Sequence, residues 1–249
     1  MGLGYIGLPT AIIAAKHGVQ VTGVDINPKV VEMTNQGHLH IVEPGMEEML
    51  QDVVRSGALH ASTTPEVSDA YFMVVPTPFK GNHEPDISYV EAATRAVIPF
   101  LKEGDLYVIE STSPVGTTDK MAKLIFELRP ELRGKIHIAY CPERVLPGNV
   151  IYELVHNDRV IGGMDEASTD KAIAFYSQFV QGTLHRLARR ADCLRQRAVA
   201  HLRQGGHQRV GAHRSRQQAS ARQHPAAWMR SGRTLHCRRP ILHHSRLPR

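Results

Sequence analysis

The amino-acid sequence predicts an α/β fold, in which helices cover a mainly parallel, doubly wound sheet. Two observations lead to this prediction. Short apolar runs alternate with longer helical stretches between residues 19 and 179, which is the pattern of strand–helix–strand units. Loops rich in glycine, proline, serine and threonine follow several of the apolar runs. The carboxyl ends of parallel strands form the edge at which such sheets bind ligands.

The expected elements follow one another in a regular order. Apolar runs predict strands at residues 19–24, 71–75, 106–109, 136–139 and 159–161. Helical stretches are expected at residues 8–15, 28–35, 46–55, 87–101, 114–128 and 166–179. Asn27 and Pro28 suit a helix start, because proline has no N–H to leave unpaired at the first helical position.

Residues 1–25 carry the most specific motif. Gly2, Gly4 and Gly7 form a Gly-x-Gly-x-x-Gly turn before an apolar helix, and the next apolar run ends on Asp25. In a Rossmann-like fold these glycines permit a tight turn, close approach to a pyrophosphate and close helix–strand packing. A carboxylate at Asp25 would bind the ribose and repel a 2′-phosphate, which predicts NAD rather than NADP. The alternative is a glycine-rich loop with an exposed acid.

The sequence shows nothing of the strand that should precede this turn. A buried parallel strand of about five or six residues is expected there, and only Met1 precedes Gly2. Either the start codon is misplaced or the sheet lacks its central strand. The second case would leave the neighbouring strands with unpaired edges.

Composition limits the class of protein. The 249 residues are 42% apolar, enough for one large domain or two modest ones. No signal peptide or run of 18 apolar residues occurs, so a cytoplasmic protein without a membrane span is expected. Cys141, Cys193 and Cys237 lack the spacing of a disulfide framework or zinc site, and no metal is expected.

Charge divides the chain into two unlike parts. Residues 1–182 hold 14 Lys and Arg against 23 Asp and Glu, whereas residues 183–249 hold 16 Arg, no Lys and the single acid Asp192. Eight of the 15 His residues also fall in the second part. We therefore expect a nucleotide-binding domain at residues 1–182 and a separate tail at residues 183–249.

Several runs resemble one family, the UDP-glucose/GDP-mannose dehydrogenases. They are GLGYIGLPT (2–10), VDIN (24–27), HIVEP (40–44), VPTPFK (75–80), ESTSPVGTT (110–118), CPERVLPG (141–148) and NDRVIGG (157–163). Among its members, those that oxidise UDP-N-acetyl-D-mannosamine for polysaccharides such as enterobacterial common antigen are the most similar. The resemblance implies NAD as cofactor, this or a related UDP-sugar as substrate, and a homodimer for the full-length family.

The resemblance also implies roles for individual residues. It assigns NAD contacts to the glycine turn and to Tyr5, Ile6, Asp25, Thr77 and Thr118. It places Thr112 and Glu143 near the reacting carbon, with Glu143 positioning water or protons, and gives Arg144 and Val145 contacts with the UDP-sugar.

Simpler interpretations of these positions stay open. Thr77 and Thr118 could cap helices, Glu143 could be a surface acid, and Cys141 is expected to be a small packed residue.

The family's four-electron oxidation uses a cysteine thiolate that holds the aldehyde as a thiohemiacetal and then a thioester. Members carry it in a Gly-Gly-His-Cys-x-x-x-Asp segment, with a lysine in a Lys-x-x-Glu-Asn segment. Neither segment occurs in this sequence.

The tail at residues 183–249 has no sustained helical or alternating pattern. A basic, disordered nucleic-acid arm is one interpretation, although natural arms usually mix lysine with arginine. Out-of-frame translation of GC-rich DNA is the other. When the amino-acid sequence of a downstream helix of the family is written in GC-rich codons and these codons are translated one base early, the product is the sequence of residues 196–213. Residues 231–240 can likewise be back-translated so that the neighbouring reading frame encodes the Gly-Gly-His-Cys segment. The codon of its cysteine would then straddle Leu235 and His236, so Cys237 is not expected to be the nucleophile.

Two hypotheses follow for the whole chain. Either it is an NAD-dependent oxidoreductase whose sequence contains a start-site or frame error, or it is an inactive fragment that at most binds nucleotide. Both predict a disordered or non-native tail and no nucleic-acid or membrane partner.

Overall fold

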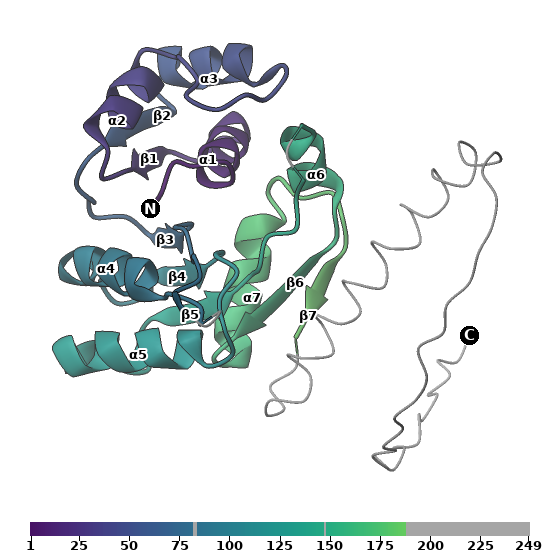
Figure 1. Cartoon of the computed structure of the whole chain (residues 1–249). Coiled ribbons are helices and arrows are strands. Elements are labelled where there is room, and N and C mark those ends of the chain that lie inside the picture. Colours follow the sequence, from purple (N-terminus) through teal and green to yellow (C-terminus); the bar gives the residue numbers. More distant parts are fainter. Residues whose placement is uncertain (82–83, 147, 188–249) are drawn as a thin grey trace, which may run out of the picture. The chain divides into compact units, whose positions relative to one another are not determined.

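The computed structural model describes residues 1–81, 84–146 and 148–187 (Figure 1). The expectations for residues 188–249, including the frame-shift and the two cysteines Cys193 and Cys237, lie outside the described residues. The expected domain boundary at residue 182 lies inside them, and the chain continues past it as a strand.

The strands form two sheets. A two-stranded parallel sheet consists of β1 (Val21–Val24) and β2 (Leu59–Ser62). A five-stranded sheet follows in sequence order: β3 (Ala70–Met73), β4 (Leu106–Ile109), β5 (His137–Tyr140), β6 (Arg159–Gly163) and β7 (Leu184–Arg186). Its pairs are parallel except β5 with β6, which is antiparallel. The predicted α/β class with a mainly parallel sheet is confirmed.

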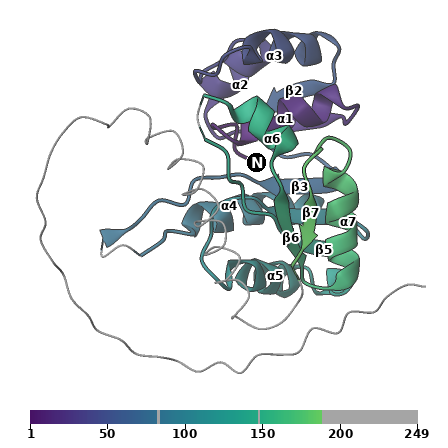
Figure 2. The same cartoon turned by 90° about the vertical axis from the view of Figure 1, so that its right-hand side faces the viewer.

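Helices cover both faces of the sheets (Figure 2). They are α1 (Gly7–Lys16), α2 (Pro28–Asn35), α3 (Met46–Arg55), α4 (Ser88–Val97), α5 (Thr117–Leu128), α6 (Val150–His156) and α7 (Glu166–Tyr176), with 3₁₀ turns at Ile98–Phe100 and Pro130–Leu132. α4 and α5 pack on one face of the five-stranded sheet, and α1, α6 and α7 contribute to the core on the other. A third core joins α1 and α3 to β2.

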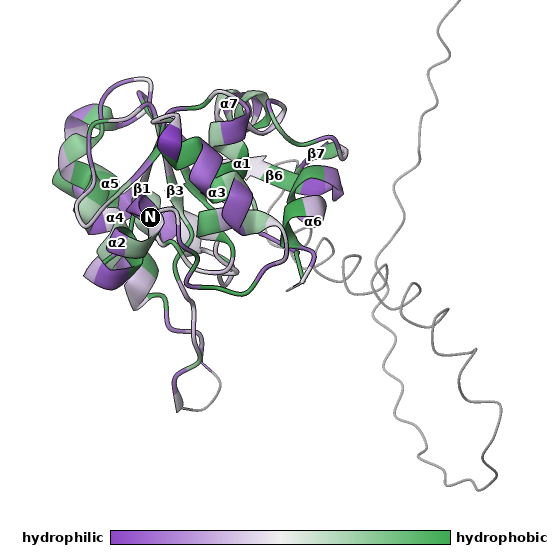
Figure 3. Cartoon of the chain, turned by 90° about the horizontal axis from the view of Figure 1, so that it is seen from above, coloured by the Kyte–Doolittle hydropathy of each residue, from purple (hydrophilic) through white to green (hydrophobic). Residues whose placement is uncertain are grey.

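Local sequence explains several helices. Asn27 caps α2 by accepting a hydrogen bond from the Lys29 N–H at 3.1 Å, and Pro28 takes the first position, as predicted from the sequence. α3 buries Met46, Leu50 and Val53 and exposes its acidic residues, so its colour alternates along the helix in Figure 3. This spacing places one apolar stripe against the core.

Residues 1–3 lie between the two sheets. The Met1 amino group donates to the Phe72 carbonyl at 2.8 Å, and the Val74 N–H donates to the Met1 carbonyl at 2.8 Å. Gly2 donates to the Val24 carbonyl at 2.7 Å. Within the described residues, β1 pairs only with β2, and β3 pairs only with β4.

Three elements were not expected from the sequence. β2 contains one strongly apolar residue, Leu59, with polar His60 and Ser62, so its run is too short to show a pattern. α6 has only seven residues. β7 falls after residue 182, in the part assigned to the tail, and pairs with β6 in parallel from Leu184 to Arg186.

Candidate functional site

Loops that follow β1, β3, β4 and β5 meet at one edge of the sheets. The Thr77 hydroxyl donates to the Thr112 carbonyl at 2.6 Å, which joins the loops after β3 and β4. Ser111 donates to the Met73 and Val75 carbonyls at 3.1 and 2.7 Å. The Glu143 N–H donates to the Glu110 carbonyl at 3.3 Å, which joins the loop after β5. The carboxyl edge is therefore a connected set of loops.

The glycine turn before α1 has little space for side chains. Gly2 has φ +91°, and a Cβ there would lie 2.4 Å from the Val74 carbonyl oxygen. A Cβ on Gly7 would lie 1.8 Å from the Gly2 carbonyl oxygen, whereas one on Gly4 would meet nothing within 4 Å. Two of the glycines are therefore required by the fold, and Gly4 leaves its backbone open to a ligand.

The amino end of α1 is available to an anion. Its N-cap residue, Ile6, makes no side-chain capping hydrogen bond, and the first turn contains no acid. The first N–H groups of a helix have no partner within the helix and attract negative charge. Tyr5, which is 48% exposed, and half-buried Ile6 flank this point, so both predicted contact residues lie beside it.

Asp25 is fixed at the end of β1. One carboxylate oxygen accepts the Leu3 N–H at 2.9 Å, and the other accepts the Asn27 N–H at 2.9 Å. A carboxylate has about four lone-pair sites, so two bonds leave capacity for ribose hydroxyls. The first of these bonds also ties Asp25 to the glycine turn.

The other predicted cofactor residues lie on neighbouring loops. Thr77 is half-buried and holds the Thr112 carbonyl rather than capping a helix. Thr118 lies in the first turn of α5, after Gly116 at φ +88°. The Thr112 side chain is exposed at the same edge.

A buried charge cluster lies beneath the edge. Arg159 Nη1 is 2.8 Å from Glu143 Oε2 and 3.7 Å from Glu110 Oε1, and its guanidinium lies 4.9 Å from the Tyr176 ring centroid. The Tyr176 hydroxyl donates to Glu110 Oε1 at 2.6 Å. Arg159 and Glu143 form a close ion pair, but the contact lacks the geometry of a hydrogen bond. The pair therefore holds two opposite charges together without fixing the orientation of the carboxylate.

Burial controls the protonation of this cluster. Burial raises the pKa of Glu110 to about 7; Arg159 opposes this shift, and the charge of Glu143 adds to it. Burial by itself would lower the pKa of the Arg159 guanidinium, but the charge of Glu143, with that of Glu110, raises it above its ordinary value. Arg159 therefore stays cationic, and Glu110 is the member that can exchange a proton near neutral pH.

Glu143 is not a free surface acid. Its side chain is 9% exposed, and its Oε1 accepts the Arg144 N–H at 2.7 Å. Both oxygens are therefore engaged, one by Arg159 and one by the neighbouring backbone. The Arg144 side chain is exposed, and Val145 packs partly against the core that contains α6 and α7.

Cys141 has no access to solvent. It is 0% exposed, and burial raises the pKa of its thiol to about 12. A buried, protonated thiol is a poor nucleophile. The position is that of a packed residue.

Sequence reasoning did not single out four residues of this region. Arg159, Glu110 and Tyr176 come from separate strands and a helix, so no local spacing connects them. Glu43 is also buried, and it accepts the Gly148 and Val150 N–H groups at 2.9 and 2.7 Å. It thereby attaches the loop after α2 to the start of α6. A glutamate inside an otherwise apolar run was the only available signal for Glu43.

The edge fits a dinucleotide. An uncapped helix start, an open backbone at Gly4 and an oriented carboxylate at Asp25 are the features such a cofactor needs. Among the described residues, no group of three or more His, Cys, Asp or Glu side chains is placed to hold a metal ion. No helix in the described part of the chain is long and apolar enough to cross a membrane.

Comparisons with known proteins agree with this geometry. Residues 1–180 match the NAD binding domain of the UDP-glucose/GDP-mannose dehydrogenase family. The chain is 52% identical over 190 residues to UDP-N-acetyl-D-mannosamine dehydrogenase of Escherichia coli, covering 73% of this chain and 45% of the relative. It is 50% identical over 190 residues to NDP-N-acetyl-D-galactosaminuronic acid dehydrogenase of Ralstonia nicotianae, with the same coverage.

A solved structure is similar as well. That of UDP-N-acetyl-mannosamine dehydrogenase from Staphylococcus aureus superposes with a TM-score of 0.73 at 44% identity, covering 76% of this chain and 47% of that one. The chain thus spans less than half the length of the relatives it matches.

Proposed function

Because the chain belongs to the UDP-glucose/GDP-mannose dehydrogenase family through its NAD-binding domain, we propose that it forms the NAD half of an enzyme that oxidises UDP-N-acetyl-D-mannosamine to the corresponding uronate. The observation that carries this proposal is the connected carboxyl edge, with the glycine turn, the α1 start and Asp25 at one end and Thr112 and Glu143 at the other. NAD, when bound, supplies the hydride acceptor.

The chain's own residues have distinct tasks in this proposal. The α1 start and Gly4 hold the pyrophosphate, and Asp25 holds the ribose. Tyr5, Ile6, Thr77 and Thr118 orient the cofactor.

Thr112 and Glu143 face the reacting carbon, and Arg144 and Val145 contact the UDP-sugar. Arg159 Nη1 lies 2.8 Å from Glu143 Oε2 and holds this side chain beside the edge.

The identity of the sugar is the finer part of the proposal. The sequence identity is 52% to the UDP-N-acetyl-D-mannosamine dehydrogenase and 50% to the NDP-N-acetyl-D-galactosaminuronic acid dehydrogenase. This difference is too small to distinguish the two sugars. Both relatives act on N-acetylated sugars by name. UDP-N-acetyl-D-mannosamine is therefore the first substrate to test, and UDP-N-acetyl-D-galactosamine is the second.

A second candidate is a protein that binds NAD without turnover. The absence of the Gly-Gly-His-Cys and Lys-x-x-Glu-Asn segments from the 249 residues favours it, since the route through a thioester needs the cysteine. Without the lysine, acid–base assistance to the first step is lost as well. We expect the chain as written to bind NAD but not to oxidise the sugar nucleotide.

One pair of assays tests both candidates. Purified full chain is titrated with NAD by calorimetry and then incubated with NAD and UDP-N-acetyl-D-mannosamine while NADH absorbance is followed. Binding without NADH formation is the expected result. NADH formation above background would show that a residue of this chain replaces the missing nucleophile, and no binding of NAD would contradict the proposed site. The Asp25→Ala variant is the matched control for specific binding.

A further inference from the structure

Glu43 joins two parts of the chain that are far apart in the sequence. It lies on the connection between α2 and α3 and is 6% exposed. Its two carboxylate oxygens accept the N–H groups of Gly148 and Val150, which are 105 and 107 positions further along the chain. We propose that Glu43 is a positioning residue, and this rests on the proposed function: it couples the NAD site to the loop that carries Arg144 and Val145, so that bound NAD orders that loop.

Carboxylates hold this loop at every second residue. Residues 143–146 and 148–149, which we call the sugar loop, follow β5 and carry the positions assigned to the substrate. The carboxylates of Glu143, Glu153 and Glu43 accept its alternate N–H groups, which are those of Arg144 at 2.7 Å, Leu146 at 2.9 Å and Gly148 at 2.9 Å. Glu143 belongs to the loop itself and Glu153 to α6. Glu43 is the member of this set that comes from the part of the chain around β1 and β2.

The neighbours of Glu43 fix it to the cofactor side. Ile41, 8% exposed, and Met46, 0% exposed, pack in the core that joins α1 and α3 to β2. Met46 also donates its N–H to the Glu43 carbonyl at 3.4 Å. The same core contains Leu8 and Ile12 of α1, the helix whose amino end is the proposed pyrophosphate site. Glu43 can therefore move away from the sugar loop only if this core loosens.

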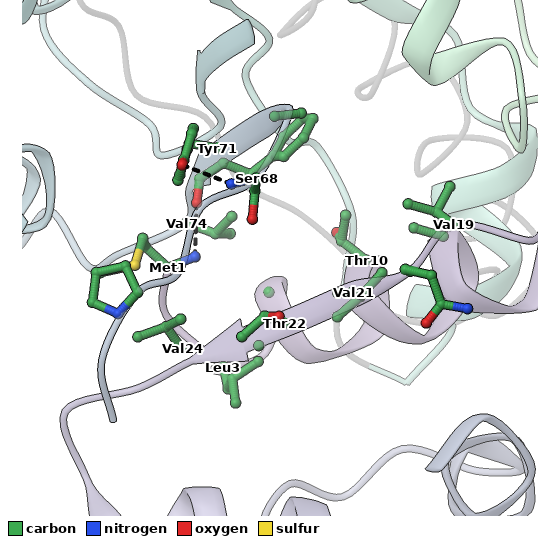
Figure 4. A pocket seen from close by; sticks show the side chains of 18 of the residues that line it. Met1, Leu3, Thr10, Val19, Val21, Thr22, Val24, Ser68, Tyr71 and Val74 are labelled. Atoms are coloured by element: carbon green, nitrogen blue, oxygen red, sulfur yellow. Dashed lines mark hydrogen bonds between the residues drawn. The ribbon is translucent and has the colours of Figure 1, made fainter. Parts of the chain in front are cut away.

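Asp25 is connected to the same core through Leu3. The Leu3 N–H donates to Asp25 Oδ2 at 2.9 Å, and the Leu3 side chain is 2% exposed and packs in that core. Figure 4 shows Leu3 beside β1, where its Cδ2 atom lies 2.7 Å from the place that a Cβ on Gly23 would take. NAD held by Asp25 and the α1 start would contact two elements that surround this core. Because a ligand that binds only the ordered form stabilises that form by mass action, bound NAD should hold Glu43 in place.

The bonds from Glu43 give the sugar loop a direction that packing alone does not. α6 lies beside α1 (Figure 2), and its residues Val150 and Leu154 pack in one core with Ile13 and Ala14 of α1. Such apolar contacts are non-directional, whereas hydrogen bonds to a carboxylate are directional and about twice as strong as those between neutral groups. Gly148 has φ +94°, so the backbone turns where Glu43 binds it. The carboxylate therefore fixes the turn through which the sugar loop enters α6.

Loss of the two bonds from Glu43 defines an open form of the sugar loop. In this form the N–H groups of Gly148 and Val150 exchange their hydrogens with solvent. A ligand shifts an equilibrium only through its different affinity for the two forms. NAD therefore slows this exchange only if the opening of the loop also disturbs the NAD site. A residue that merely anchored α6 would give exchange that does not depend on NAD.

Amide hydrogen exchange of the full chain, followed by NMR with and without NAD, tests the coupling. NAD is added at about ten times the dissociation constant measured by calorimetry. Exchange at Gly148 and Val150 should then slow by about tenfold, because NAD stabilises the closed form by mass action. The reference is the Arg129 N–H, which bonds the Ile125 carbonyl at 2.8 Å at the end of α5. Since helix ends fray locally, its exchange should change little.

Glu43→Gln keeps the size of the side chain but replaces one acceptor oxygen with an NH₂ group, which cannot accept. Exchange at Gly148 and Val150 should become at least about tenfold faster than in the parent, and bound NAD should no longer slow it. Glu153→Gln is the matched control, because it makes the same change at the carboxylate that holds Leu146. It should speed exchange at Leu146 and preserve the effect of NAD at Gly148 and Val150.

A third variant covers a failure of Glu43→Gln to fold, which circular dichroism would show. Glu43→Asp then takes its place. It keeps the charge, but its side chain is one methylene shorter and cannot reach both N–H groups. The same loss of the NAD effect is expected.

The outcomes separate the coupling from the proposed function. NAD binding in calorimetry without slower exchange at Gly148 and Val150 would overturn the coupling and leave the NAD site in place. Equal slowing in the parent and Glu43→Gln, or loss of the slowing in Glu153→Gln, would also overturn it, because Glu43 would then be one of several interchangeable anchors. Absence of NAD binding would overturn both the coupling and the proposed site.

Discussion

The two sheets of the described part differ in how they are supported. The five-stranded sheet is a continuous ladder from β3 to β7 with cores on both faces. β1 and β2 form an isolated pair, and isolated two-stranded sheets are marginally stable. Their link to the larger sheet is α1, which packs into both neighbouring cores, together with the backbone bonds of Met1 and Gly2.

This difference concerns function, because the glycine turn and Asp25 belong to the less supported part. Loops that bind ligands are commonly held on a rigid scaffold. Here the five-stranded sheet, beside which Glu143 and Arg159 lie, has cores on both faces, whereas the pair that carries Asp25 has less support. We therefore expect opening of the β1–β2 part to occur without global unfolding.

A matched pair of substitutions tests this difference most strongly. Leu106 in β4 and Leu59 in β2 are both 1% exposed. Leu106→Ala should lower the free energy of global unfolding by roughly 2–5 kcal/mol. Leu59→Ala should instead accelerate amide exchange in β1 and β2 and leave the β4 amides protected. Equal loss of protection in both sheets, measured by hydrogen exchange, would show one cooperative unit.

The glycine turn provides the next largest effect. Gly7→Ala places a Cβ against the Gly2 carbonyl, with no flexible atom to move, and should cost about 3 kcal/mol or more. Gly4→Ala meets nothing and should preserve stability while weakening NAD binding. Thermal unfolding and NAD titration of both variants separate the two roles. A destabilised Gly4→Ala would contradict this division.

The buried acid Glu110 predicts a dependence of stability on pH. Its pKa is raised by burial from 4.5 to about 7, so the folded state holds the proton more tightly. The stabilisation that comes from this tighter proton binding is fully present below pH 4.5 and is lost as pH rises through 7. The free energy of unfolding should fall by an amount on the order of 3 kcal/mol over this range.

Glu110→Gln keeps an acceptor for Tyr176 and should remove this slope in denaturant unfolding at several pH values. The Met1 amine, whose pKa is lowered by burial to about 6, should raise stability between pH 6 and 8 in both proteins. Because the charge of Glu110 opposes that shift, the rise should be larger in the variant, and it adds to the difference between the two profiles. A parallel pH profile for parent and variant would show that Glu110 does not titrate in this range.

The smallest effect is expected on the surface. Arg95 and Glu91 form an exposed i,i+4 pair on α4 at 2.9 Å. Arg95→Ala should change the free energy of unfolding by less than about 0.5 kcal/mol, because exposed pairs are screened by solvent. A larger change in urea unfolding would mean that the helix surface contributes more to the five-stranded part than its cores suggest.

Sequence periodicity predicted the elements that have a long, regular pattern. The helix expected at residues 46–55 and the strand at residues 106–109 occur with those bounds. β2 and α6 were missed because a four-residue strand and a seven-residue helix contain too few positions to show a period.

The candidate site was predictable in part. Asp25 and the glycines follow from a fixed spacing along the chain, so local sequence reveals them. Arg159 meets Glu143 and Glu110 only after three separate strands have paired. Such a cluster depends on topology, and no sequence spacing encodes it.

Paired calorimetric titrations with NAD and NADP test the central claim, that the carboxyl edge is a dinucleotide site in which Asp25 selects the cofactor. Because a 2′-phosphate would meet the Asp25 carboxylate, NAD should bind the full chain at least about tenfold more tightly than NADP, a difference of about 1.4 kcal/mol. Equal affinities would contradict the assignment of Asp25 to the ribose, and the absence of binding by either dinucleotide would contradict the site itself.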